Sequence, residues 1–155
     1  MATADDVETY RRYSPELVRY ATVLVGPADA ADVVTDAVLA AFAAPSWADV
    51  ANRRAYLYRA VLNHSSSFHR SASRRRRREE LVAARTRPVT ESPPDSIDAH
   101  RALAALSEQQ RAVTYLTYWE DLAPDRIAEL LGVAEGTVRK QLARARDHLR
   151  RILDA

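Results

Sequence analysis

Apolar side chains recur every three or four residues along most of the chain, and runs that alternate with a period of two are few. Alanine, leucine and arginine dominate, and all three favour helices. The dipeptide Ser14-Pro15 has the order of an N-cap followed by proline at the first helical position. The pattern of the first half therefore predicts four helices, one ending near Tyr13, one from Ser14 to Val25, one carrying Ala30 to Ala41, and one from Asn52 to Ser73.

The helical pattern stops after Ser73 and begins again at Ala99. Residues 74–98 are first basic and then rich in proline, which is typical of a linker. Ser107, with Gln110 three residues later, has the form of a capping box and predicts a helix to about Trp119. Two further helices are expected, from Pro124 to Leu131 and from Glu135 to Leu153. The predicted fold class is all-α, with two small helical domains at residues 1–73 and 99–155 joined by a flexible linker at residues 74–98.

The last two predicted helices have the spacing of a helix-turn-helix. Gly132 stands where the chain must leave the first helix in a left-handed conformation. On the second helix, every third or fourth residue is apolar and would be buried: Val138, Leu142, Ala145, Leu149 and Ile152. Arg139 and Lys140 lie on the opposite side, where basic side chains can reach base edges and phosphates in a major groove. Gly136, in the first turn, would permit close approach of a DNA backbone.

The helix predicted from Asn52 has a polar face opposite its apolar one. That face combines an aromatic ring, an amide, a hydroxyl and three arginines without any carboxylate: Tyr56, Arg59, Asn63, Ser67, Arg70 and Arg74. Arginine suits phosphates, asparagine and serine suit base edges, and tyrosine offers a stacking surface. The pattern favours binding of opened, single-stranded DNA, with an ordinary solvated helix face as the alternative.

Charge is distributed unevenly, although the formal net charge is only +2. Residues 51–78 hold nine arginines and no acid, and residues 135–151 hold six bases against two acids. Residues 1–50 instead hold eight acids and three arginines. Two basic blocks favour a nucleic-acid partner, and the acidic start favours a second partner. Asp29, Asp32 and Asp36 lie beside an apolar stripe, a combination that can bind protein and that an ordinary amphipathic helix also shows.

Catalysis, metal binding and membrane insertion are not expected. The most basic segment has no carboxylates to hold a catalytic metal, and His64 and His69 are five residues apart, so they share a helix face poorly. There is no cysteine, which fits a reducing cytoplasm, and no apolar run reaches membrane-spanning length. The first ten residues are acidic and polar, unlike a secretory signal. We therefore expect a cytoplasmic protein without a cofactor.

Three segments together resemble the extracytoplasmic-function (ECF) sigma factors of bacterial RNA polymerase. The first half of the sigma-2 domain is similar to VETYRRYSPELVRYATVLVG and DAADVVTDAVLAAF, and its promoter-melting part is similar to RAYLYRAVLNHSSSFHRSASRRRRR. The sigma-4 domain is similar to the segment from Leu103 to Leu153, which is the most specific match. The resemblance implies a non-catalytic subunit that binds core polymerase, recognises the −35 and −10 promoter elements and aids promoter melting.

The resemblance also implies roles for individual residues. Those that match the −35 reader are Glu135, Gly136, Thr137, Arg139, Lys140 and Arg144. Those that match the −10 reader, joined with the polar face of the long helix, are Arg54, Tyr56, Arg59, Asn63, His64, Ser67, Arg70 and Arg74. Docking on the clamp helices of the largest polymerase subunit is implied for Asp32, Val33 and Asp36, with Asp29 on the same helix.

The same resemblance implies further partners, and the chain also differs from the family's usual pattern at several positions. The helix from Arg111 to Trp119 would face the polymerase flap, and an anti-sigma factor is an expected partner. The chain has Tyr56 where the family commonly has tryptophan, Ser67 where it has aspartate, and Ala134 where it favours a serine cap. The alternatives are a stand-alone helix-turn-helix regulator that binds DNA as a homodimer and an inactive sigma-like protein that only binds polymerase.

Overall fold

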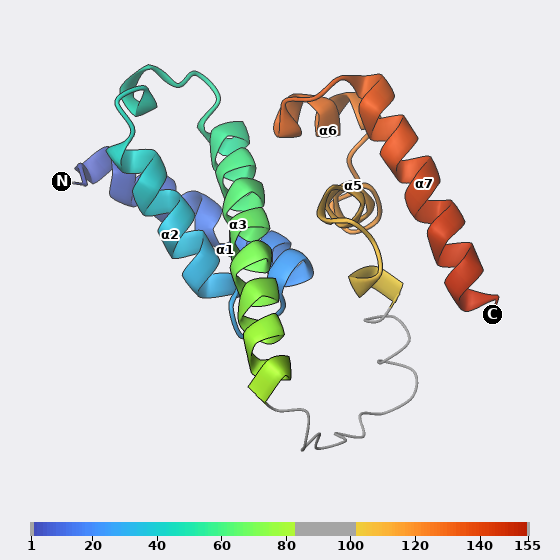
Figure 1. Ribbon diagram of the computed structural model, residues 1–155. Helices are drawn as coiled ribbons and strands as arrows, with labels where there is room; N and C mark the ends of the chain where they lie inside the picture. The colour runs from blue at the N-terminus through green and yellow to red at the C-terminus, as the bar shows by residue number, and fades with distance from the viewer. Residues whose placement is uncertain (1, 83–101, 155) are drawn as a thin grey trace.

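The protein is a bundle of helices arranged as two halves (Figure 1). A computed structural model describes residues 2–82 and 102–154, and all regular structure in these two ranges is helical, which confirms the predicted fold class. The N-terminal half contains α1 (Ala4–Val25), α2 (Ala30–Ala43), the 3-10 turn η1 (Trp47–Asp49) and α3 (Arg53–Val82). The C-terminal half contains α5 (Glu108–Tyr118), α6 (Pro124–Leu131) and α7 (Glu135–Leu153).

Helix α1 is a single helix, so the predicted break at Ser14-Pro15 is wrong. A capping box formed by Thr3 and Asp6 begins the helix, and Pro15 lies inside it. Proline inside a helix costs about 3 kcal/mol because it removes one hydrogen bond and crowds the preceding turn. Burial on both sides of Pro15 offsets that cost, because one face of the uninterrupted helix is buried at Asp6, Thr9, Leu17, Tyr20, Ala21 and Leu24.

Helix α3 is longer than the pattern predicted. It begins at Arg53, as expected, but continues past Ser73 to Val82 and so takes in the run of arginines at 74–78. Arginine is a good helix former, and its charge does not prevent an exposed helix from continuing. The rest of the predicted linker, residues 83–98, lies outside the described residues.

The C-terminal half follows its predicted boundaries closely because local signals determine them. The capping box of Ser107 and Gln110 is present at the start of α5, and Pro124 is the first residue of α6. Gly132 ends α6 in the left-handed conformation, with φ 70° and ψ 35°. Helix α7 has the predicted bounds.

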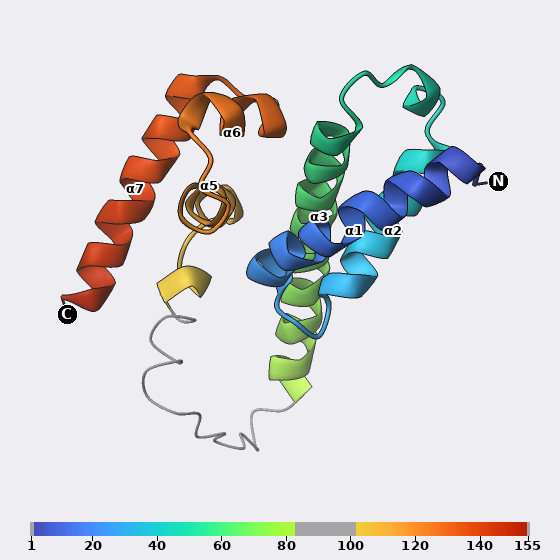
Figure 2. The same cartoon turned by 180° about the vertical axis from the view of Figure 1, so that it is seen from behind.

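The two halves pack against each other through one continuous hydrophobic core. Figures 1 and 2 both show α5 and α6 beside α3. Tyr20 of α1 lies between Tyr58 of α3 and Tyr115 of α5, with ring centroids 4.8 and 6.1 Å apart. Ile127 and Leu131 of α6 belong to the same buried cluster. The sequence had predicted two domains but not this contact between them. Among the described helices, none is both long and apolar enough to cross a bilayer.

Candidate nucleic-acid interface

Helices α6 and α7 form the predicted helix-turn-helix. Gly132 donates its backbone N–H to the carbonyl of Ala128 at 2.9 Å, and Val133 donates to the same carbonyl at 3.1 Å, which closes the turn. Ile127 and Val138 are fully buried where the two helices meet. Val138, Leu142 and Ala145 are buried and hold α7 against the rest of the half, as the spacing predicted, whereas Leu149 and Ile152, also predicted to be buried, are only half-buried. The opposite side of α7 is thereby left exposed.

The structure brings the six predicted −35 residues together in the first turns of α7. We call them the α7 outer face: Glu135, Gly136, Thr137, Arg139, Lys140 and Arg144. Thr137 is half-buried and the other five are exposed. Arg139 donates from Nε and Nη2 to one carboxylate oxygen of Glu135, at 3.1 and 2.7 Å, and this bond orients its guanidinium along the helix. A rigid helix with an exposed basic side is the geometry that reads a DNA groove.

The long polar face of α3 is also present. We call it the α3 stripe: Tyr56, Arg59, Asn63, Ser67, Arg70 and Arg74. Tyr56 is half-buried and the other five are exposed. Part of the stripe borders a groove of about 400 Å³, with Ala37, Ala40 and Ala41 of α2 on the other side. His64 lies in the groove wall and bonds through Nδ1 to the carbonyl of Ala60 at 2.9 Å. A groove with small apolar side chains, an aromatic ring and an amide can accommodate an unpaired base.

Tyr56 is held by an aromatic cluster at the start of α3. Its ring meets Trp47 edge-on, with centroids 5.5 Å apart. Trp47 in turn donates from Nε1 to Asp6 at 2.9 Å. The backbone N–H of Thr3 and this indole donor lower the pKa of the Asp6 carboxyl. The position of Tyr56 beside the groove is therefore set by the amino end of α1.

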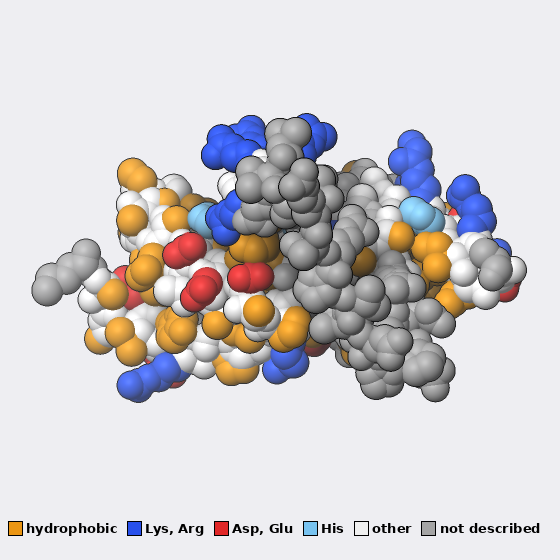
Figure 3. Space-filling view, turned by 60° about the horizontal axis from the view of Figure 1, so that its bottom comes forward, with side chains coloured by type: hydrophobic (Ala, Val, Ile, Leu, Met, Phe, Trp, Pro, Cys, Tyr) orange, Lys and Arg blue, Asp and Glu red, His pale blue; other side chains and the backbone are white. Residues whose placement is uncertain are grey.

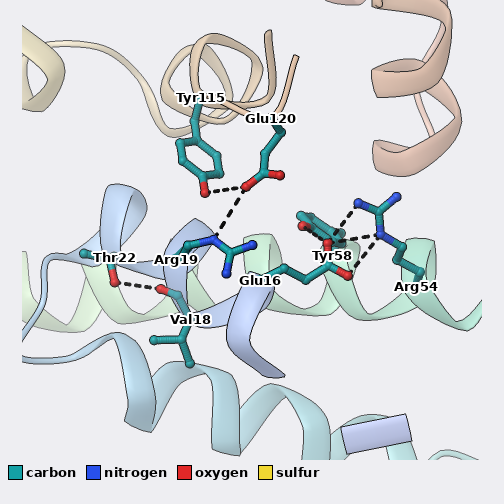
Figure 4. Close-up of polar contacts among 8 residues, drawn as sticks. All are labelled: Glu16, Val18, Arg19, Thr22, Arg54, Tyr58, Tyr115 and Glu120. Carbon is teal, nitrogen blue, oxygen red and sulfur yellow. Dashed lines mark hydrogen bonds and ion pairs between the residues drawn. The ribbon is translucent and has the colours of Figure 1, made fainter. Parts of the chain in front are cut away.

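Arg54 is bonded within the N-terminal half, to a carboxylate of α1 (Figure 4). Its Nε and Nη2 donate to the carboxylate of Glu16, with shortest distances of 3.1 and 2.9 Å, and the hydroxyl of Tyr58 donates to Glu16 at 2.8 Å. The hydrogen bonds to Glu16 raise the pKa of Arg54, and burial raises the pKa of Tyr58. Arg54 thus remains charged and Tyr58 remains a donor.

Glu16 contributes to this site but was not among the residues predicted from the sequence. In a helix that begins at Ser14, Glu16 would lie in the first turn, where an exposed acid is ordinary. If α1 is read as one helix, Glu16 lies one turn before Tyr20 and one turn after Tyr13, at the edge of the buried face. A carboxylate at the edge of a buried face needs a hydrogen-bond or ion-pair partner. That requirement could have indicated from the sequence that Glu16 bonds within the fold.

Arg59 links the α3 stripe to the C-terminal half. Its Nη2 donates to the backbone carbonyl of Glu129 in α6 at 2.9 Å. The guanidinium also lies against Gly132, where an added Cβ would be 2.6 Å from Nε of Arg59. The sequence offered no sign of this contact, since it joins residues 70 positions apart.

The predicted polymerase-binding residues do not all reach the surface. Asp32 and Asp36 are exposed on α2 and Asp29 is half-buried, but Val33 is only 5% exposed and packs in the core. Leu39, one turn after Asp36, is 60% exposed and was not singled out from the sequence. Figure 3 shows acidic side chains gathered among apolar ones on the N-terminal half. Two aspartates and a leucine therefore form the exposed part of this surface.

The helix predicted to face the polymerase flap corresponds to α5, and only part of it is exposed. Arg111 donates from Nη1 to the carbonyl of Leu24 at 2.9 Å, so it faces α1. Burial lowers the pKa of this guanidinium. Tyr118 and Trp119 at the carboxyl end are 55% and 64% exposed.

Within the described residues, no three His, Asp or Glu side chains are grouped as metal ligands.

Comparison with known proteins finds two family models that match the chain. The family model described as "Sigma-70 region 2" matches residues 9–75, and "Sigma-70, region 4" matches residues 96–149. The chain is 31% identical to the RNA polymerase sigma-E factor of Streptomyces avermitilis, over 96% of this chain and 84% of that one. It is 34% identical to the ECF RNA polymerase sigma factor SigL of Mycobacterium tuberculosis, over 86% and 80%.

Similarity to a solved structure extends over both halves. The sigma factor RpoE of Bartonella quintana, solved in complex with the anti-sigma factor NepR, superposes with a TM-score of 0.66 and 25% identity, and the match covers 99% of each chain. With matches to both sigma-70 regions and to relatives along nearly its full length, the chain belongs to the ECF family of RNA polymerase sigma factors.

Proposed function

We propose that this chain is a promoter-specificity subunit whose two reading surfaces are the α7 outer face and the α3 stripe. The α7 outer face would bind the −35 element, and the α3 stripe would hold the opened −10 element. The observation that carries the proposal is the position of both surfaces. Each is an exposed basic helix face, and each lies in a segment that matches one sigma-70 region. Phosphate contacts would supply affinity, while base edges and the groove beside Tyr56 would supply selectivity.

Two protein partners follow from this role. Asp32, Asp36 and Leu39 on α2 form an acidic and apolar surface suited to docking on core polymerase. An anti-sigma factor is a second expected partner, because the B. quintana relative was solved with one. The role is not catalytic, and it places the protein in the cytoplasm with the polymerase.

Run-off transcription with bacterial core polymerase tests the proposal. Promoter-specific transcripts should require the chain and should be lost when Asp32→Lys and Asp36→Lys reverse the charge of the docking surface. A matched control is Asp147→Lys with Asp154→Lys, which reverses two exposed aspartates near the carboxyl end of α7. Tight binding to a palindromic duplex, with no transcript from any promoter fragment, would instead establish a stand-alone regulator.

A further inference from the structure

Arg59 occupies a position where two surfaces meet. It belongs to the α3 stripe, and it donates to the carbonyl of Glu129 in α6 at 2.9 Å. That carbonyl is in the last turn of α6, where carbonyls have no partner within the helix. The last turn is also the negative end of the helix dipole, which favours a cation. Arg59 therefore satisfies a group of the helix-turn-helix from outside that domain.

The guanidinium of Arg59 lies against the turn of the helix-turn-helix. Gly132 is the left-handed residue of the turn, and a Cβ added there would lie 2.6 Å from Nε of Arg59, so the end of the Arg59 side chain would have to shift. Arg54 and Asn52 border a pocket whose other wall is formed by Leu122, Arg126 and Glu129. The C-terminal half thus lies along one edge of the surface proposed to hold −10 DNA.

Contacts on either side keep the two halves in this arrangement. Arg19 of α1 lies 3.8 Å from Glu120, which also accepts from the hydroxyl of Tyr115 (Figure 4). Ser66 of α3 donates to Glu108 at the start of α5. The shared aromatic core lies between these polar contacts. Several contacts, and not Arg59 alone, therefore hold the two halves together. We call this arrangement the closed chain.

The closed chain cannot read both promoter elements on one duplex. The −35 and −10 positions are 25 base pairs apart, or about 85 Å at about 3.4 Å per base pair. Glu135, the first residue of α7, follows Gly132 by three residues, so their Cα atoms are at most about 11 Å apart. Since Gly132 lies against Arg59, the two reading surfaces are far too close together.

We propose that Arg59 exchanges partners between the carboxyl end of α6 in the closed chain and a −10 phosphate in the open chain, so that the C-terminal half restrains −10 binding until the halves separate. The inference rests on the proposed function, since it assigns the α3 stripe to the −10 element. Both partners present oxygen acceptors to one guanidinium, and in the closed arrangement the Nε and Nη2 edge of that guanidinium already faces the Glu129 carbonyl and Gly132.

Reversible crosslinking of the closed chain tests this exchange. Asn52→Cys and Arg126→Cys place two thiols on walls of the same pocket, one from each half, in a chain that has no other cysteine. A bismaleimide with a disulfide in its spacer would join them, and reduction would release them. The linked chain should bind a −35 duplex normally, because the α7 outer face is free in the closed arrangement.

Run-off transcription with core polymerase then distinguishes the outcomes. Linking should reduce transcripts about tenfold or more, and reduction should restore them, since loss of one charge-assisted contact alone can account for about that factor. Equal transcription from the linked and unlinked chains would overturn the inference while leaving the proposed function intact. No transcripts from the unlinked chain would reject the proposed function itself, and the inference with it.

A second measurement uses the chain without polymerase. Arg19→Ala with Glu108→Ala removes contacts between the halves without changing a proposed DNA contact. Binding of a single-stranded −10 oligonucleotide should strengthen by about three- to tenfold, as expected for partly exposed polar contacts. The matched control is Arg150→Ala with Asp154→Ala, which also removes one base and one acid but at exposed positions by the carboxyl end of α7. Unchanged binding in the first variant would contradict the restraint.

Discussion

The two proposed reading surfaces differ in how far they are part of the fold. On the α7 outer face, Lys140 and Arg144 are exposed and Arg139 bonds only to Glu135 on its own helix. Among the predicted −10 residues of α3, by contrast, Arg54, next to the α3 stripe, bonds to Glu16 of α1, and Arg59 of the stripe bonds to α6. The side chains of the α7 outer face bond only within their own helix. At the start of α3, in contrast, one arginine bonds to α1 in the same half and another bonds to α6 in the opposite half.

This difference teaches how substitutions should be interpreted. Removing a side chain from the α7 outer face should change DNA binding alone, because no other element depends on it. Removing an arginine from the start of α3 should change stability or domain arrangement as well as binding. Activity alone therefore cannot assign a role to Arg54 or Arg59, whereas it can for Arg139.

The largest effect is expected for Arg139→Ala with Lys140→Ala. Each good base contact contributes about 1–3 kcal/mol of discrimination, so losing two should reduce promoter-specific transcription about 100-fold or more. The free energy of unfolding should change by less than about 0.5 kcal/mol, since both side chains are exposed. Run-off assays and chemical denaturation measure the two effects. Arg150→Ala with Arg151→Ala, at the far end of α7, is the charge-matched control.

A pre-melted template would separate the two surfaces. Asn63→Ala with Arg70→Ala removes two exposed members of the α3 stripe, of which Arg70 bonds only to Ser67 on the same helix at 3.2 Å. Transcription from duplex DNA should fall about tenfold, because unstacking a base pair requires a few kcal/mol of compensating contacts. A template with an unpaired −10 region should recover most of that loss. The same template should not restore transcription by the Arg139→Ala, Lys140→Ala variant. Equal recovery of both variants would contradict the separate roles proposed for the two surfaces.

A double-mutant cycle would measure how far Arg54 belongs to the fold. Arg54→Ala should lower the free energy of unfolding by about 1 kcal/mol, a value reduced for solvent screening because the side chain of Arg54 is 38% exposed. Glu16→Ala should destabilise the chain as well, and the double variant should cost less than the sum. Denaturation of all four chains provides the coupling energy. Arg70→Ala is the control. If Arg54→Ala is as stable as the unsubstituted chain, Arg54 does not stabilise the fold and belongs with the arginines that only contact DNA.

The predictions from sequence succeeded where local chemistry determines structure. Ser107, Pro124 and Gly132 mark helix ends through caps and backbone conformation, and α5, α6 and α7 have the expected bounds. The same kind of rule failed at Pro15, because burial of one face of α1, both before and after Pro15, outweighs the cost of the proline. The partners of Arg54 and Arg59 were also out of reach, since they depend on how distant helices pack. The sequence named the candidate site residues as sets that stay predictions, and it gave no sign of which side chains bond within the fold.

The smallest effects are expected at the start of α7, where two substitutions stabilise the helix and only one should disturb DNA. Ala134 precedes α7 with extended backbone and provides no side-chain cap, so Ala134→Ser should add about 0.5–1 kcal/mol of stability. Gly136→Ala should add a similar amount through helix propensity, because a Cβ there meets nothing within 4 Å. If a DNA backbone approaches Gly136, its variant alone should bind a −35 duplex several-fold more weakly, about 1 kcal/mol. Denaturation and fluorescence anisotropy measure both quantities, and equal DNA affinity in the two variants would show that Gly136 is not a contact.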